Sequence, residues 1–144
     1  MANVVPDSFK TDLLKGTFNF DSSGGSSFKL ALYTNISGLT TSTTAFTTSN
    51  EVSTSGTNYT SGGNTLTNNG VAVSSNIAFV GFADLTFSSV TLSAVGALIY
   101  KSSSGNEAVL VLDFGGTKTA TNGDFVVQFP TANSSSAIIR LGDA

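Results

Sequence analysis

The chain has 144 residues, enough for one domain that buries a hydrophobic core without disulfides or structural metal. It contains no cysteine and no histidine, which excludes disulfide frameworks, thiolate zinc sites and Ser-His-Asp catalysis. Charged residues make up 10% of the chain against about 25% in a typical protein, and the net charge is −3, so no basic surface for nucleic acid or an anionic membrane is expected.

Hydroxyl side chains replace charge in this sequence, which holds 22 serines and 20 threonines. Disordered chains are also polar, but they are poor in hydrophobic residues. Here 40% of the residues are hydrophobic and 11 are phenylalanine. Because threonine, valine and phenylalanine favour strands, the composition predicts a folded all-β domain.

The N-terminal segment is predicted to form an arm with a short helix. Asp7 or Ser8 can cap the start of this helix, and Gly16 can end it. Phe9 and Leu13 are four residues apart and lie on one helix face. A helix of two turns is not stable alone, so this face must dock. It docks either on the sheet of its own subunit or on a neighbouring subunit.

The following residues alternate between polar and apolar side chains, as strands do. This pattern begins at 17–20 and continues at 28–33. Residues 35–76 are rich in Ser, Thr, Asn and Gly, and we expect a long, partly stranded excursion over the surface. The second half of the chain is the predicted core, with apolar segments at 77–82, 85–87, 90–100, 108–114, 125–129 and 137–141.

Turn-forming residues separate these apolar segments, and Gly115-Gly116 is predicted to lie in a hairpin between Leu112 and Phe125. Eight or nine short strands indicate a single antiparallel β-sandwich or jelly-roll-like domain. No helix-length pattern lies between the strands, which excludes a parallel α/β sheet. The predicted division is an arm with a short helix at 1–16 and a β-sandwich domain at 17–144.

One stretch, Asp113–Thr119, resembles the phosphate-binding opening of sugar kinases of the actin-like class. Only 25 residues follow Thr119, and no helical pattern follows Gly116 to face a phosphate. The nine acidic residues fall mostly in predicted turns and form no dense acidic loop. The prediction is therefore a protein without catalytic residues, metal site or cofactor.

Candidate assembly contacts come from the arm and from the excursion. They are the apolar side chains Val4, Val5, Phe9 and Leu13 in the arm, and Phe46 and Tyr59 in the excursion. Two alternatives remain for the aromatic residues of the excursion. They either hold the loop on the sheet or line a sugar-binding platform together with Tyr33.

Several segments carry a resemblance to a known family. They are FKLALYT at 28–34, NEV at 50–52, YTSGG at 59–63, GALIY at 96–100, LDFGG at 112–116 and IIR at 138–140. In this order they resemble small virion proteins of tailed bacteriophages, of the structural or head-decoration (cement) type. The resemblance implies β-rich subunits that add to an assembled particle, often as trimers, and it supplies no catalytic residue.

The expected function is that of a non-enzymatic virion protein, a capsid decoration protein that binds and stabilises the assembled shell. Its expected partner is the phage major capsid protein, and its expected location is the virion. A surface with few charges agrees with this role because few ions need to be desolvated when an interface forms. The alternative is a tail or baseplate component, or a receptor-binding protein that uses the polar excursion for adhesion.

Overall fold

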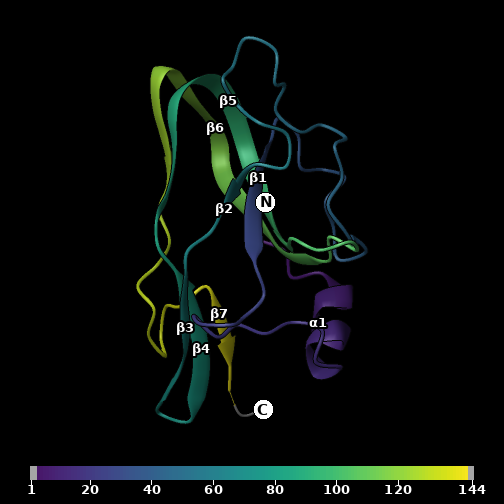
Figure 1. The fold of residues 1–144 in the computed structure, drawn as a ribbon, viewed down its shortest axis with the longest axis vertical. Helices are drawn as coiled ribbons and strands as arrows, with labels where there is room; N and C mark the ends of the chain where they lie inside the picture. The colour runs from purple at the N-terminus through teal and green to yellow at the C-terminus, as the bar shows by residue number, and fades with distance from the viewer. Residues whose placement is uncertain (1–2, 143–144) are drawn as a thin grey trace.

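Figure 1 shows a mostly β computed structural model, which describes residues 3–142. The elements are α1 (Asp7–Leu14), β1 (Phe28–Tyr33), β2 (Asn64–Thr65), β3 (Asn68–Ser74), β4 (Ile77–Phe82), β5 (Leu85–Lys101), β6 (Ala108–Val127) and β7 (Ile139–Leu141). One sheet has the strand order β2-β1-β5-β6 and the other β3-β4-β7, and all pairs are antiparallel. The predicted all-β class is confirmed, and the two sheets are consistent with a sandwich.

The long hairpin of β5 and β6 dominates the first sheet (Figure 1). Its pairing register shifts four times, and one shift falls where β6 contains Gly115 and Gly116. Gly115 has a φ of 74°, which glycine adopts without steric cost. The predicted hairpin between Leu112 and Phe125 is therefore wrong, because the glycines form a bulge inside a continuous strand. The described residues contain seven strands in place of eight or nine, because 85–87 and 90–100 form the single strand β5, 108–114 and 125–127 fall in the single strand β6, and the expected strand at 17–20 does not form.

The predicted helix is confirmed as α1, but its start differs from the prediction. Pro6 occupies the cap position, and neither Asp7 nor Ser8 caps the first turn with its side chain. The Asp7 N–H instead donates to the carbonyl of Thr41, 2.9 Å away, which ties the helix to the excursion. Gly16 follows the helix with a φ of 80°, as expected for a residue that ends one.

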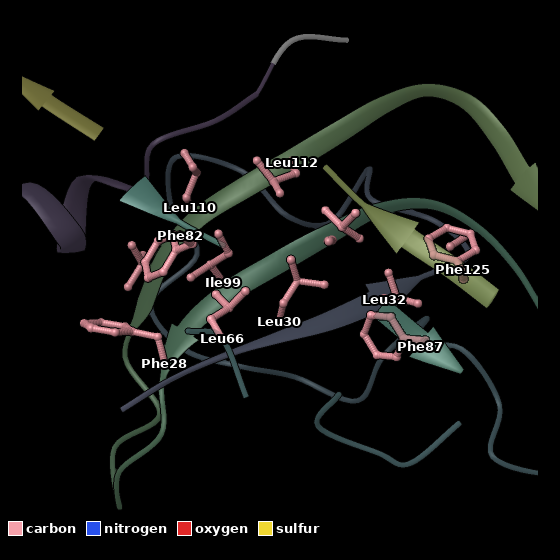
Figure 2. Close-up of a cluster of buried hydrophobic side chains, with 14 of the residues drawn as sticks. Phe28, Leu30, Leu32, Leu66, Phe82, Phe87, Ile99, Leu110, Leu112 and Phe125 are labelled. Carbon is pink, nitrogen blue, oxygen red and sulfur yellow. The ribbon is translucent and has the colours of Figure 1, made fainter. Parts of the chain in front are cut away.

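The central strands bury both of their faces. Leu30 and Leu32 of β1 face the main core, together with Ile99 of β5 (Figure 2). Ala31 and Tyr33 face a second cluster on the opposite side. Strands that are covered on both sides have nearly continuous apolar sequences, as 28–33 and 96–100 do.

Aromatic rings join the two sheets and the helix in the main core. Phe20 and Phe28 are stacked with ring centroids 4.7 Å apart. Phe82 of β4 meets Phe28 edge-on at 5.9 Å, and Phe9 of α1 lies 5.0 Å from Phe18. Offset and edge-to-face ring pairs stabilise a core beyond the area they bury. The helix therefore docks on its own subunit.

The excursion forms the cover of the second cluster. Ile36 and Leu39 are buried there, and Phe46 stacks on Tyr100 with centroids 4.7 Å apart. Isolated bridges at Tyr33–Glu51 and Ala45–Glu107 fix its path, and β2 and β3 lie within its second half. The prediction of a long, partly stranded excursion is confirmed, and its apolar residues close a core.

Candidate functional site

The predicted contact residues of the arm lie largely against their own subunit. Val4 forms an antiparallel bridge with Val111 of β6, with N–O distances of 2.9 and 2.8 Å. Phe9 is buried in the main core, Leu13 packs against it half-buried, and Val5 is exposed. Phe9 is thus corrected from a candidate contact to a core residue. The described part of the arm lies on its own subunit, and residues 1 and 2 lie outside the described residues.

The two contact residues predicted in the excursion also point inward. Tyr59 is 3% exposed, and its hydroxyl accepts the Leu32 N–H at 3.0 Å. Phe46 is half-buried on Tyr100. Tyr59 is therefore corrected to an internal anchor, and of the alternatives the structure favours a loop held on the sheet. The sugar platform is wrong because Tyr33 and Tyr59 are both buried.

Glu51 organises this part of the molecule, and the sequence analysis missed it. Its carboxylate accepts hydrogen bonds from the Tyr59 hydroxyl at 2.8 Å, the Ser61 hydroxyl at 2.8 Å and the Gly62 N–H at 2.6 Å. A carboxylate that accepts several hydrogen bonds holds a loop strongly, because bonds to an ionised group are stronger than neutral ones. A signal exists in the sequence, since Glu51 is the only charged residue between Lys29 and Asp84.

The hydroxyl groups of Tyr100 and Tyr33 extend the hydrogen-bond network around Glu51. The Tyr100 hydroxyl donates to the Gly62 carbonyl at 2.7 Å, and the Tyr33 hydroxyl donates to the Thr47 carbonyl at 2.6 Å. Burial raises the pKa of all three tyrosines of the chain. The phenols therefore stay protonated near neutral pH and act as hydrogen-bond donors that fix the excursion.

The stretch that resembles a kinase motif is a local turn inside β6. The Gly115 N–H donates to the Asp113 carboxylate at 2.8 Å, and this bond lowers the pKa of Asp113. Strand residues follow Gly116, in place of the helix that a phosphate site needs. Among residues 3–142, no group of three or more acidic side chains is placed to hold a metal ion.

Four exposed apolar side chains belong to α1, β3 and β7, elements that lie in the lower half of the molecule in Figure 1. Leu14 is 89% exposed, Val73 72%, Leu141 57% and Val71 54%. We call these four residues the terminal apolar surface. Val71, Val73 and Leu141 share one sheet face, because Val73 and Leu141 both pair with Ala78 and Val71 is two residues from Val73.

Two hollows lie along this surface. A groove of about 660 Å³ runs between α1 and β7 and is lined by Leu13, Leu14, Ile139 and Leu141, among other residues. A second hollow of about 260 Å³ lies beside it, under Val71, and shares Leu13, Ile139 and Leu141 with the groove. Exposed contiguous apolar surface marks binding sites for proteins or other apolar partners.

Neither a family model nor a curated protein nor a solved structure matches this chain. The helix α1 has eight residues, and no helix in the described part of the chain has the length and hydropathy needed to cross a membrane. The terminal apolar surface and its groove are therefore the candidate functional site on geometry alone.

Proposed function

We propose that this chain is a non-enzymatic structural protein of a bacteriophage particle, a capsid decoration protein that binds the assembled shell. The observation that carries the proposal is the terminal apolar surface with its groove, which fits a protein partner. The order of segments such as FKLALYT and LDFGG, which resembles head-decoration proteins, supports a phage shell as that partner.

The groove suits docking because it is largely apolar. Among residues 3–142, Lys10 and Arg140 are the only charged residues that line it, so few ions lose water when a partner covers it. Covering one exposed leucine contributes about 1.5–3 kcal/mol, and Leu14 and Leu141 both border the groove. A protein that binds the assembled shell and not its free subunits stabilises the shell by mass action.

The experiment compares binding of purified variants to undecorated shells by co-sedimentation. We expect L14D/L141D to bind at least about tenfold more weakly than wild type, because each change removes a burial contribution of about 1.5–3 kcal/mol. The matched control is V126D, which adds one charge at a half-exposed valine of β6 outside both hollows. Equal binding of L14D/L141D and wild type would rule out the groove as the docking site.

Gold-labelled antibody against the chain then locates it on intact particles. Label over the heads supports decoration. Label confined to the tails would overturn it in favour of a tail or receptor-binding protein. Particles that carry neither label nor chain after denaturation would overturn the assignment to a virion.

A further inference from the structure

The strand β3 is an edge of the second sheet, with β4 beside it. The turn between the two strands consists of Ser75 and Asn76, with φ values of 53° and 65°. Two consecutive positive φ angles are typical of a type I′ hairpin turn. The flanking residues Ser74 and Ile77 pair directly across this turn, and in a two-residue hairpin that pair is hydrogen-bonded.

The turn determines which N–H and C=O groups of β3 point toward β4 and which point away from it. Hydrogen-bonded and non-hydrogen-bonded pairs alternate along an antiparallel ladder. Ala72 pairs with Phe79 two positions from the turn pair and is therefore bonded to β4. Val71 and Val73 belong to the other set, so their N–H and C=O groups point away from β4. The free edge of β3 thus presents donors and acceptors of two residues whose side chains are largely exposed.

Charge distinguishes this edge from the opposite edge of the same sheet. Proteins normally protect edge strands with charged residues or proline, but no charged residue and no proline lies between Glu51 and Asp84. By contrast β7, at the other edge of the sheet, carries Arg140 at its centre. Two copies of β7 in contact would place like charges together, whereas two copies of β3 meet without charge repulsion.

We propose that β3 pairs with β3 of a second copy of this chain, antiparallel, about a two-fold axis at Ala72. In this register Val71 lies opposite Val73 of the second copy, and Val73 lies opposite Val71. The N–H and C=O groups of Val71 and Val73 point away from β4. In this register each of these groups forms a hydrogen bond with a backbone group of the second copy. The two three-stranded sheets become one continuous sheet, and the exposed valines pack against each other across the axis.

This inference goes beyond the proposed function and does not rest on it. It assigns a surface and a symmetry to self-association, and it specifies a dimer where the family resemblance implies a trimer. The two-fold axis is perpendicular to the sheet, so the apolar faces of both copies lie on the same side. One dimer therefore presents both terminal grooves in the same direction.

Sedimentation velocity of the purified full chain over a concentration series tests the proposal. Wild type is expected to shift from monomer to dimer as concentration rises. In V71K/V73K each lysine faces a lysine of the second copy, and we expect the dimer to weaken at least about tenfold. In V71K/V73E each lysine faces a glutamate, and we expect a dimer restored to within about threefold of wild type.

The two double variants carry equally polar side chains, so their difference reports the register and not surface hydrophobicity. A third variant, V126K, places a charge at a half-exposed residue of β6, outside the edge and the terminal apolar surface, and should dimerise like wild type. Circular dichroism checks that each variant keeps the wild-type fold. A wild-type chain that stays monomeric or forms trimers would overturn the proposal, as would equal dimerisation of V71K/V73K and V71K/V73E. No shell is present in this assay, so its result is separate from that of the shell-binding test.

Discussion

Removal of one oxygen atom from Tyr59 tests whether the phenol network holds the excursion on the core. The Tyr59 hydroxyl accepts the backbone N–H of Leu32 and donates to the Glu51 carboxylate. Leu32 lies in β1, where this hydroxyl takes the position of a neighbouring strand. The variant Tyr59→Phe keeps the ring and its contact with Phe87, whose centroid is 5.8 Å away, so the change is confined to the two hydrogen bonds.

The expected loss of stability follows from the hydrogen bonds that Leu32 and Glu51 lose. The Leu32 N–H is buried and is left without an acceptor, which costs about 1–3 kcal/mol. Glu51 is half-buried and keeps its bonds to Ser61 and Gly62, so the loss of the third bond costs less than the loss of a sole partner. We expect the free energy of unfolding to fall by about 2–3 kcal/mol in total.

Urea unfolding followed by far-ultraviolet circular dichroism measures this change. The midpoint is expected to fall while the slope with urea stays constant, because the surface exposed on unfolding is unchanged. The matched control is Tyr33→Phe, whose hydroxyl donates to the part-buried Thr47 carbonyl and leaves no buried N–H behind, so we expect about 1 kcal/mol. If Tyr59→Phe costs no more than Tyr33→Phe, the argument from the Leu32 N–H is refuted.

Two more predictions concern the same region. The pKa of each tyrosine is raised by burial, so the stability that the neutral phenols provide is present below about pH 10 and is lost as pH rises above it. Tyrosinate absorbance of Tyr33 and Tyr59 should therefore appear together with the loss of circular dichroism, and ionisation of either phenol in the folded protein would contradict this. Separately, a Cβ at Gly63 would overlap the Leu30 carbonyl oxygen, whereas one at Gly56 meets no atom within 4 Å, and both residues have positive φ. Gly63→Ala should cost at least about 3 kcal/mol and Gly56→Ala about 1–2 kcal/mol in urea unfolding, and equal costs would disprove the contact.

The sequence could predict those parts of the fold that depend on local pattern. The apolar runs at 28–33 and 96–100 correspond to paired strands, because a strand buried on both faces needs apolar side chains at every position. The spacing of Phe9 and Leu13 likewise placed the first helix. In both cases the information lies within a few consecutive residues.

The bulges of the long hairpin could not be predicted in the same way. Asn122 has a φ of 45° and Gly115 a φ of 74°, values that also occur in hairpin turns. Whether such a residue reverses the chain or bulges within a strand depends on the strand that pairs with it. That partner, β5, lies about twenty or more residues away along the chain, so local residue types do not distinguish the two outcomes.

The candidate site escaped prediction for a related reason. Val71 and Val73 stood in a polar stretch that was expected to cover the surface, and Phe9 and Tyr59 were expected to contact a partner. The structure exchanges these roles, because Phe9 and Tyr59 are buried within the subunit while the two valines stay more than half exposed. Sequence pattern identifies which residues are apolar, but only the arrangement of the elements decides which of them the fold has room to cover.

The two sheets differ in how far the rest of the subunit covers them. In the sheet β2-β1-β5-β6 the central strands are covered on both faces, and the Glu51 network fixes the excursion over one of them. In the sheet β3-β4-β7, β3 buries none of its residues and has a strand neighbour, β4, on one side only. An edge strand without buried residues leaves backbone groups and apolar side chains in water, so a further strand or an apolar cover would stabilise this sheet. Self-pairing at β3 and docking at the groove would both add contacts to this sheet, where Val71, Val73 and Leu141 are more than half exposed.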